Sequence, residues 1–598
     1  MLKTMNCGDI RPENVGQIVT LAGWVHRRRD HGGLIFIDLR DRAGLAQIVF
    51  NPDLGTQAHH SSQDIRSEWV LKVTGKVEQR PKGTENTDIG TGQVELIVHE
   101  VEILNPSKTP PFYINEDTDV EESLRLQYRY LDIRKPRTFT NLMLRHKVVK
   151  FIRDFLDSRD FLEVETPILI KSTPEGARDF LVPSRLQPGH FYALPQSPQQ
   201  LKQLLMVAGV EKYFQIARCF RDEDPRADRQ FEFTQLDLEM SFVEENDVLS
   251  LIEELYTGII STVTPKKRVI TPFKRLTYAE AMSRYGTDKP DLRFGMELVD
   301  ITDIATQSQF QVFRSVLSDG GEIKGFAAPG CAGYSRRQLD DLVEYVRARG
   351  AKGLITVGLD YQASSLKDLT MDQVHSVAAR YLTFDQIIEI ARRMSAKPGD
   401  LLLIVAGPSE LTNESLSQLR NEMGQRLKLA DPDLLSFAFV VDFPLLEWKS
   451  EENRWSALHN PFSAPRHEDI PLLDTNPGSA LARQYDLVCN GYETGGGSIR
   501  NHQRAVQEKI FELLGHTKEG MDAEFGQLLD ALEYGAPPHG GIATGIDRLV
   551  MLLANEKNLR EVTAFPKTQS GADLLFGSPS PVSTEQLHEL QLRIIDGE

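Results

Sequence analysis

The chain comprises 598 residues, with 68 Lys or Arg against 86 Asp or Glu and a formal net charge of −18. So negative a protein is a poor candidate for unspecific nucleic-acid binding, which depends on a broad positive potential. The length predicts several domains, and the sequence has neither an apolar run long enough to cross a membrane nor the apolar core of a secretory signal near its N-terminus.

Residues 1–108 contain five short runs in which apolar and polar side chains alternate, as in strands with one buried face. Turn residues, including Gly32-Gly33, separate the runs, which lie at 18–25, 34–39, 46–50, 69–77 and 94–103. Five such strands are typical of a small Greek-key barrel of the OB type.

One side of this predicted barrel carries residue types that suit single-stranded bases. Arg29 ends a run of three arginines, and Phe36 and Gln47 follow on the next two strands. A guanidinium, a ring and an amide on one face can stack on and hydrogen-bond splayed bases. Taken singly, Phe36 could equally be a core residue and the arginines a solvated edge.

A polar, proline-bearing stretch at 105–120 predicts a linker, and we expect a hinge over 109–138. The pattern then predicts a helix broken at Pro136 and a long amphipathic helix over 139–158. That helix leads into a strand at 161–167, FLEVETP.

The next helix is predicted to start near Ser197, which would be its cap, with Pro198 in its first turn. Gln199 and Lys202 lie three residues apart and therefore share one face of this helix. A lysine is usually a surface residue, but this one immediately precedes the strongest motif of the chain.

Residues 213–242 predict two strands joined by a charged loop at 224–229. In the second strand apolar residues such as Leu236 alternate with polar ones such as Asp237, so one face packs on a core and the other faces a cleft. Arg221 and Glu223 would lie on one side of the first strand. Alone, such a hairpin is most often an edge laced with surface ion pairs.

The pattern of this predicted core stops at about residue 288. Residues 294–429 read as a separate mixed α/β set, with a helix at 335–349, a strand at 352–360 and no catalytic constellation. The core pattern resumes at 434–443, and the chain ends in a short predicted helix at 583–594.

A second cluster of polar residues lies in the C-terminal part. Asp486 and Glu493 flank a predicted hairpin turn, three glycines follow at 495–497, and Arg500 comes next. Glycines at such a turn let a ligand approach the bare backbone. His459 lies in a loop, where a histidine is usually only solvent-exposed.

Three stretches resemble the signature motifs of the class II aminoacyl-tRNA synthetases. Motif 1 corresponds to 161–167 with Pro167, motif 2 to 213–242 with Arg221-Asp222-Glu223, and motif 3 to 540–553 with Arg548. Their order across roughly four hundred residues is a far stronger signal than any one of them. The whole chain is most similar to the bacterial aspartyl-tRNA synthetases, in which the first domain binds the anticodon.

The resemblance implies an α+β multidomain fold. We expect an N-terminal OB-fold β-barrel (1–108), a hinge (109–138), an antiparallel-sheet class II catalytic domain flanked by helices and an inserted mixed α/β domain (288–429). The catalytic domain would comprise 139–287 and 430–570, followed by a C-terminal extension at 571–598.

The implied reaction joins L-aspartate to ATP as an adenylate and then transfers it to tRNA, with Arg221, Glu493 and Arg548 as catalytic residues. The family pattern places aspartate at Glu175, Ser197, Gln199, Lys202, Arg221, Asp237, His459 and Arg500. It places ATP at Arg221, Asp222, Glu223, Gln230, Phe233, Glu493, Gly545, Ile546, Asp547 and Arg548. Many relatives carry two adjacent histidines where this chain has His459-Asn460, which leaves the role of Asn460 open.

Asp486 and Glu493 match carboxylates that hold Mg²⁺ on the ATP phosphates, a task that suits an ion that retains several waters. Arg29, Phe36 and Gln47 would bind the anticodon. The family also implies a homodimer. Four well-separated cysteines, Cys7, Cys219, Cys331 and Cys489, argue against structural zinc and disulfides and fit a cytoplasmic protein.

His31 and Gly83 bear on which tRNAs are charged. In this family, strict enzymes tend to carry a bulky apolar residue and a lysine at these two barrel positions, whereas non-discriminating relatives resemble this chain. A histidine can donate or accept a hydrogen bond and a glycine removes a side chain, so we expect tRNA-Asp and tRNA-Asn both to be substrates. The alternatives are an enzyme strict for tRNA-Asp, an amide-forming paralogue, and an RNA-binding protein with an inactive core.

Overall fold

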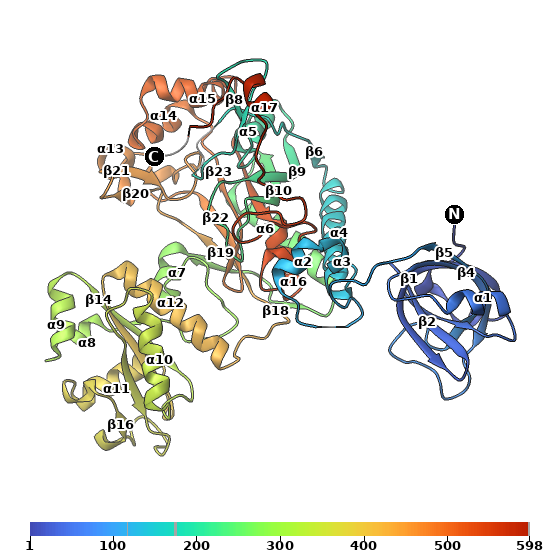
Figure 1. Ribbon diagram of the computed structural model, residues 1–598. Coiled ribbons are helices and arrows are strands. Elements are labelled where there is room, and N and C mark those ends of the chain that lie inside the picture. Colours follow the sequence, from blue (N-terminus) through green and yellow to red (C-terminus); the bar gives the residue numbers. More distant parts are fainter. Residues whose placement is uncertain (117, 173–175, 596–598) are drawn as a thin grey trace. The chain divides into compact units, whose positions relative to one another are not determined.

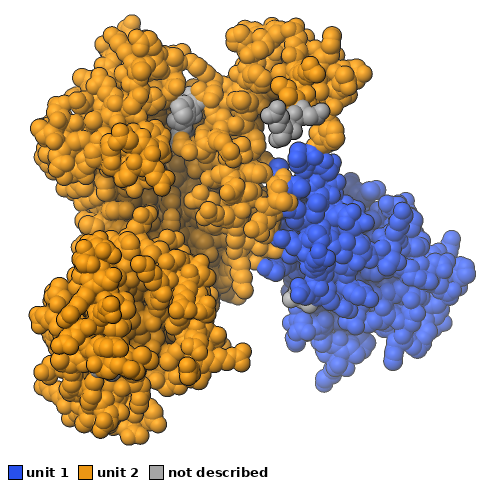
Figure 2. All heavy atoms as spheres, turned by 60° about the vertical axis from the view of Figure 1, so that its left-hand side comes forward, with its two compact units in different colours: residues 1–140, 564–568, 572–579 blue, residues 141–563, 569–571, 580–598 orange. Residues whose placement is uncertain are grey.

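The computed structural model describes residues 1–116, 118–172 and 176–595. The described chain divides into two compact units, coloured separately in Figure 2. Unit 1 comprises residues 1–140, 564–568 and 572–579, and unit 2 comprises the remainder. No helix within these described ranges is long and apolar enough to span a membrane.

Unit 1 contains a closed five-stranded barrel of order β1-β2-β3-β5-β4, drawn in blue in Figure 1. Its strands are β1 (Ile18–His31), β2 (Leu34–Asp41), β3 (Gly44–Phe50), β4 (Val70–Gln79) and β5 (Val94–Asn105), with α1 (Thr56–Ser62) between β3 and β4. Alternate residues such as Leu21, Ile37 and Val73 fill its core. The predicted barrel is thus confirmed, although β1 extends past its predicted end at residue 25 and includes the three arginines at 27–29.

The hinge contains α2 (Glu122–Gln127) and α3 (Arg129–Asp132), and α4 (Pro136–Asp157) follows. Arg134 of the hinge and Arg40 of β2 both pair with the buried Glu68, each at 2.8 Å. The predicted break at Pro136 is confirmed, since α3 ends at Asp132 and a new helix begins at Pro136, three residues before the predicted start of the long helix at 139. A proline at that position loses no intrahelical hydrogen bond, since the first N–H groups of a helix have no partner within it.

Unit 2 is built on an eight-stranded sheet of order β12-β19-β22-β23-β24-β10-β9-β6. Only its two edge pairs, β12 with β19 and β6 with β9, are parallel. The strands are β6 (Leu162–Glu163), β9 (Lys212–Phe220), β10 (Glu232–Ser241), β12 (Lys274–Thr277), β19 (Phe437–Val441), β22 (Gln484–Cys489), β23 (Tyr492–Ile499) and β24 (His539–Gly545).

One face of this sheet is covered by α4, α6 (Glu245–Val263) and α16 (Ile546–Leu553), which bury a single large core. Leu236 and Leu238 of β10 point into that core, whereas Asp237 between them lines a pocket on the opposite face. The predicted alternation therefore divides core from cleft. Helix α5 (Gln199–Val207) starts one residue later than predicted, and Pro198, not Ser197, is its N-cap.

The inserted part forms a second sheet of order β13-β14-β17-β15-β16 with helices on both faces (Figure 1). Its strands are β13 (Val299–Asp300), β14 (Glu322–Ala328), β15 (Ile355–Leu359), β16 (Val374–His375) and β17 (Leu401–Gly407). Its helices are α8 (Thr302–Thr306), α9 (Gln311–Ser318), α10 (Arg336–Arg347), α11 (Phe384–Arg393) and α12 (Ser409–Arg426).

Arg420 of α12 ties the inserted part to the segment that leads into it. Its buried guanidinium donates to the carbonyl oxygens of Asp291, Phe294, Gly295 and Met296 at 2.8–3.2 Å. Nearby, Arg293 Nη1 donates to the Asp431 carbonyl, 138 residues further on, at 3.3 Å. The outgoing and returning chain segments are therefore held together where the insertion begins and ends.

The remaining elements are short or lie around this frame. They are β7 (Leu181–Pro183), β8 (Phe191–Ala193), β11 (Arg268–Val269), β18 (Leu434–Leu435), β20 (Leu446–Lys449), β21 (Arg454–Ala457), α7 (Tyr278–Tyr285), α13 (Leu472–Thr475), α14 (Arg504–Leu513), α15 (Lys518–Leu532) and α17 (Thr584–Glu589). Helix α17 is shorter at both ends than the helix predicted at 583–594.

Candidate active site

A pocket opens on the uncovered face of the large sheet, between the β9–β10 hairpin, β23, β24, α5 and the start of α16. Residues that the sequence assigned to aspartate and ATP meet here although the chain separates them by up to 351 positions. Those lining the pocket are Ser197, Gln199, Lys202, Arg221, Glu223, Gln230, Phe233, Asp237, His459, Glu493, Arg500, Gly545, Asp547 and Arg548.

Three of the described residues assigned to aspartate, ATP or Mg²⁺ are not part of this lining. Asp222 faces Arg178, whose carbonyl accepts from the Asp222 amide at 3.0 Å. Ile546 points into the core under the sheet, and Asp486 is buried on the neighbouring strand β22. Glu175 lies outside the described residues.

A fully buried quartet of charges forms one end of the pocket. Lys202 Nζ lies 2.9 Å from Asp237 Oδ2 and 3.4 Å from Glu239 Oε2. Arg500 Nε lies 2.9 Å from Glu239 Oε1. All four side chains are at most 3% exposed. Two cations thus face two carboxylates, and this pairing is what makes such deep burial of charge tolerable.

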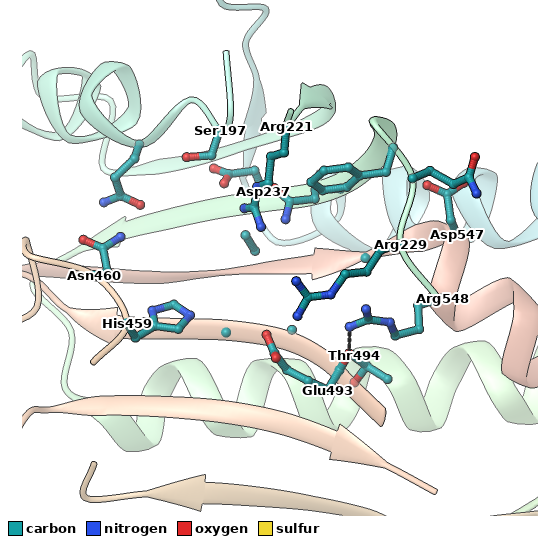
Figure 3. A pocket seen from close by; sticks show the side chains of 18 of the residues that line it. Ser197, Arg221, Arg229, Asp237, His459, Asn460, Glu493, Thr494, Asp547 and Arg548 are labelled. Carbon is teal, nitrogen blue, oxygen red and sulfur yellow. Dashed lines mark hydrogen bonds between the residues drawn. The ribbon is translucent and has the colours of Figure 1, made fainter. Parts of the chain in front are cut away.

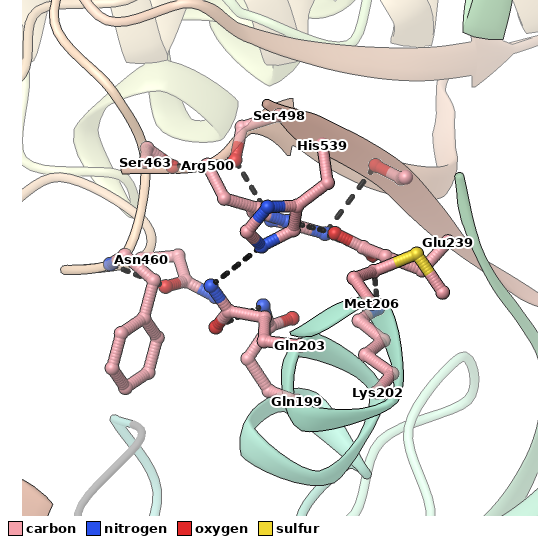
Figure 4. A network of polar contacts seen from close by, with 12 residues as sticks. Gln199, Lys202, Gln203, Met206, Glu239, Asn460, Ser463, Ser498, Arg500 and His539 are labelled. Atoms are coloured by element: carbon pink, nitrogen blue, oxygen red, sulfur yellow. Dashed lines mark hydrogen bonds and ion pairs between the residues drawn. The ribbon is translucent and has the colours of Figure 1, made fainter. Parts of the chain in front are cut away.

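Figure 4 shows how Arg500 is already engaged. Its Nε–Nη2 edge binds the two carboxylate oxygens of Glu239, and Nη1 donates to Ser498 Oγ at 2.7 Å. Asp237 Oδ1, by contrast, is buried without a hydrogen-bond partner among the described residues. Burial raises the pKa of Asp237 despite Lys202, whereas at Glu239 the nearby Arg500 and Lys202 outweigh burial and lower the pKa.

His539 lies beside this quartet, and Figure 4 shows the contact of its ring with Gln203. Its Nδ1 lies 2.7 Å from the Pro537 carbonyl and its Nε2 lies 3.3 Å from the amide nitrogen of Gln203. A carbonyl only accepts and an amide NH₂ only donates, so Nδ1 carries the proton and the ring is neutral. Burial lowers the pKa of His539, in agreement with this geometry.

The other end of the pocket is rich in guanidinium groups. Arg221 stands over the Phe233 ring, 5.1 Å from its centroid. Arg229 Nη1 donates to Glu223 Oε2 at 3.1 Å, and Arg548 binds the Asp228 carbonyl. Arg548 also donates to the Glu493 carbonyl, as the dashed line in Figure 3 marks. The Nε atoms of Arg221 and Arg548 and the Gln230 amide nitrogen are buried without a described partner. Buried donors left unpaired are costly, so this end fits an anionic ligand with acceptor atoms.

Beneath this end, the carboxylate of the half-buried Glu493 lies close enough to the buried Asp486 to affect its pKa. Burial and the neighbouring Glu493 raise the pKa of Asp486. Burial by itself would raise the pKa of Glu493, but His459 and nearby cations outweigh it, so the pKa of Glu493 is lowered. A Cβ at Gly496 would lie 3.0 Å from both Asp486 Oδ1 and His459 Nε2, so a larger residue there would push these side chains aside.

No set of three or more His, Cys, Asp or Glu in the described part of the chain forms a metal cage. One or two carboxylates beside a phosphate position are nevertheless what Mg²⁺ uses when it accompanies a nucleotide. Glu493 lines the pocket and fits this use. Asp486 lies behind Gly496, and its raised pKa fits a supporting position better.

Asp547 lines the pocket but its carboxylate is engaged within the protein. Its two oxygens accept from Arg145 of α4 and, at 2.7 Å, from the Thr234 backbone amide of β10. It therefore fastens the helix that carries Arg548 to the β9–β10 hairpin. This arrangement favours a positioning role over direct contact with ATP.

On the barrel, Arg29, Phe36 and Gln47 lie on one outer face. Arg29 Nη2 contacts Asp38 at 2.8 Å and Gln47 at 3.3 Å, and Phe36 pairs with Arg29 across β1 and β2. Phe36 is only partly buried and is absent from the barrel core, which excludes the core-residue alternative. His31 is exposed beside the β1–β2 turn.

Gly83 adopts φ of +89°, and a Cβ there would meet no atom within 4 Å. Its backbone conformation is one that other residues adopt only with strain. Gly83 therefore serves a turn, as well as leaving space for a neighbour.

The sequence did not single out Glu239, Asp228 or Arg229 as site residues. Glu239 continues the alternation of Phe233, Gln235 and Asp237 along β10, so the period-two pattern could have identified it. Asp228 and Arg229 belong to a loop in which almost every residue is charged. No pattern in the sequence distinguishes the charges that turn inward from those in solvent.

Comparison with known proteins gives consistent matches. Residues 121–569 match the model of the tRNA synthetases class II (D, K and N), and residues 19–104 match an OB-fold nucleic acid binding domain. The chain is 58% identical over 594 residues to an aspartate–tRNA(Asp/Asn) ligase of Dehalococcoides mccartyi, covering 99% of both chains. It is 52% identical over 587 residues to the same-named enzyme of Heliobacterium modesticaldum, covering 98% of this chain and 95% of that one.

Among solved structures, the fold resembles asparaginyl-tRNA synthetases with bound asparaginyl-adenylate. For the Pyrococcus horikoshii protein the TM-score is 0.58 at 18% identity, covering 95% of this chain and 99% of that chain. For the Entamoeba histolytica protein it is 0.59 at 19% identity, covering 94% and 98%. At such identities the likeness concerns the fold alone.

Proposed function

Because the chain belongs to the class II tRNA synthetases of the D, K and N group, we propose that it activates L-aspartate with ATP and attaches it to tRNA-Asp and tRNA-Asn. The observation that carries the proposal is the pocket in which the buried Arg500 and Lys202 lie at one end and Arg221 and Arg548 at the other. The relatives named as aspartate–tRNA(Asp/Asn) ligases support the substrate and the pair of tRNAs.

The first step would join the aspartate α-carboxylate to the α-phosphorus of ATP, with loss of pyrophosphate. Arg500 and Lys202 would bind the side-chain carboxylate, because guanidinium and ammonium groups are strong donors to it. Arg500 and Lys202 each have more N–H donors than their contacts with Glu239 and Asp237 use, so both can also bind the carboxylate of the substrate. Ser197, Gln199, Asp237 and His459 would complete the contacts with aspartate.

ATP would lie along the guanidinium-rich end. Phe233 offers a ring for the base, Glu223 and Gln230 offer groups for its edge, and Arg221 and Arg548 offer charge for the phosphates. Glu493, supported by Asp486, would hold the Mg²⁺ that neutralises phosphate charge. No protein nucleophile is needed, so catalysis would consist of positioning and charge neutralisation.

In the second step the terminal adenosine hydroxyl of tRNA would take the aspartyl group. The barrel face formed by Arg29, Phe36 and Gln47 would hold the anticodon through stacking and hydrogen bonds. Since tRNA is the substrate and the four buried cysteines are free thiols, we place this reaction in the cytoplasm.

We also propose a homodimer. Apolar side chains that are 41–57% exposed gather on β7, β8 and the segment before them, namely Ile168, Leu169, Leu181, Phe191 and Tyr192. Several exposed apolar side chains in one region favour burial against a second copy. Light scattering on the purified chain should give twice the mass of 67.4 kDa, and a monomer at micromolar concentration would contradict the proposal.

The decisive experiment for tRNA choice is aspartylation of purified tRNA-Asp and tRNA-Asn. The third anticodon base is C in one and U in the other, and the exposed His31 can serve either base as donor or acceptor. We expect the wild type to charge both and His31→Leu to charge tRNA-Asn less well. Gly83→Lys needs Gly83→Ala as its control, because both carry the strain of a positive φ. Failure of the wild type to charge tRNA-Asn, at levels that fully charge tRNA-Asp, would support the strict alternative.

A further inference from the structure

Arg548 is held by oxygens of the protein at the place assigned to the ATP phosphates. Its Nη2 donates to the Asp228 carbonyl at 2.9 Å and lies 3.3 Å from the Asp228 carboxylate, while Nη1 donates to the Glu493 carbonyl. The Arg548 side chain is 21% exposed and that of Asp228 is 34% exposed. The carboxylate of Asp228 therefore pairs with the Arg548 guanidinium that would bind a phosphate of the nucleotide.

Asp228 belongs to the loop between β9 and β10, and its neighbour Arg229 makes a complementary contact. Arg229 pairs with Glu223, the carboxylate assigned to the edge of adenine. The carbonyl of Ala227, the residue before Asp228, accepts from the Leu559 amide at 2.9 Å, which fixes the loop over the pocket. Figure 3 shows Arg229, Glu493 and Arg548 reaching into the same space. Two neighbouring residues of this loop thus pair with residues assigned to ATP. Arg229 pairs with Glu223 at the adenine position, and Asp228 pairs with Arg548 at the phosphate position.

We propose that the Asp228 carboxylate is an internal competitor for the γ-phosphate of ATP at Arg548. The pair holds Arg548 in place before ATP binds, opens when the triphosphate arrives, and forms again as pyrophosphate leaves. The inference rests on the proposed function, because it assumes that this pocket binds ATP.

The physical basis is an exchange of one anion for another on the same guanidinium. A partly exposed ion pair is weak, so a phosphate with more charge and more acceptor oxygens displaces the carboxylate readily. When pyrophosphate leaves, Arg548 does not remain as an unpaired, partly buried cation, because Asp228 is adjacent. The carboxylate therefore opposes tight retention of both ATP and pyrophosphate. AMP carries no γ-phosphate and should not compete with Asp228.

The test is calorimetric titration of the full chain with ATP, pyrophosphate and AMP, each with Mg²⁺ and without aspartate. The variants are Asp228→Asn, Asp228→Ala and, as the matched control, Asp224→Asn, which removes the same charge from an exposed position in the same loop. Asp228→Asn and Asp228→Ala should bind ATP and pyrophosphate about two- to fivefold more tightly than the wild type, the range expected for loss of a weak ion pair. AMP affinity and the control variant should be unchanged.

Several results would overturn the inference. Weaker binding of ATP by both Asp228 variants would show that Asp228 positions Arg548 for the nucleotide. If Asp224→Asn raised the affinity for ATP equally, or if the Asp228 variants raised the affinity for AMP equally, the effect would come from the overall charge of the loop and not from competition at Arg548. Wild-type protein that binds neither ATP nor AMP would overturn the proposed function together with the inference, whereas unchanged ATP binding in the Asp228 variants would overturn the inference alone.

Discussion

At the scale of single residues, Arg500 carries two tasks in the same guanidinium. It neutralises Glu239 inside the protein and, as proposed, it binds the side chain of aspartate. A planar group with five donors can serve both, which a lysine ammonium cannot do with the same geometry. Any substitution there therefore changes both the fold and the substrate site.

We expect Arg500→Leu to lower aspartate-dependent ATP–pyrophosphate exchange by roughly 10⁴, as found for sites that lose a buried partner of the substrate. The same change leaves Glu239 with Lys202 alone, and breaking a buried pair costs about 3–5 kcal/mol of stability. Arg500→Lys keeps a cation beside Glu239 and should lose activity with a smaller loss of stability. Arg504→Leu, four residues away and outside the pocket, is the control. Near-normal exchange in folded Arg500→Leu would refute the assignment.

Residue types and spacing predicted most of this pocket, because groups that must alternate along β10 or share a face of α5 are fixed by local geometry. The partners of each group were not predictable in the same way. That Arg500 meets Glu239, 261 positions earlier, follows only from the order of β10, β24 and β23 in the sheet. The inward turn of Asp228 depends likewise on tertiary packing.

At the scale of elements, four of the five barrel strands were predicted to within two residues at each end, whereas β1 runs six residues past its predicted end. Helix starts were less well predicted at the prolines, since Pro136 and Pro198 take the first helical and the N-cap positions respectively. Both positions tolerate a missing N–H, so proline alone does not tell a helix start from a break. Arg221 follows β9 instead of lying in it, because the strand ends at Phe220.

The outer face of β2 gives a prediction at this scale. Phe36→Ala should remove a base-stacking contact of about 1–3 kcal/mol and weaken tRNA aminoacylation. Since Phe36 is outside the barrel core, the barrel should remain folded and tRNA-independent pyrophosphate exchange should be unchanged. Parallel measurement of both activities checks this. An equal loss in the two assays would show that Phe36 acts through folding.

At the scale of the whole molecule, burial lowers the pKa of three histidines, His26, His502 and His539. The unfolded chain binds their protons below a pH of about 6.5, whereas the folded chain resists protonation until lower pH. The unfolded state then carries more protons, so these groups lower the free energy of unfolding as the pH falls. Each contributes up to about 1.4 kcal/mol per pH unit between its unfolded and its folded pKa.

We expect the urea midpoint of the wild type to fall between pH 7.5 and 5.5, and that of His539→Gln to fall less. The variant removes one titrating ring while leaving the carboxyl groups that titrate nearby, so the difference between the two slopes isolates His539. Identical slopes would contradict the neutral state that its hydrogen bonds to Pro537 and Gln203 indicate.

Arg420 and Arg293 hold together the two chain segments that enter and leave the inserted domain, so this domain could be replaced as a unit. A hydrogen bond between Arg293 and Asp431, 138 positions apart, already joins the two segments. The entropy cost of closing the long loop is therefore met largely within the inserted domain and adds little to the cost of folding the catalytic core. A short peptide could join the two segments in its place, provided that Arg420 and the carbonyl oxygens it satisfies are removed together. The same clamp marks where a foreign domain could be grafted into the enzyme without reshaping the pocket.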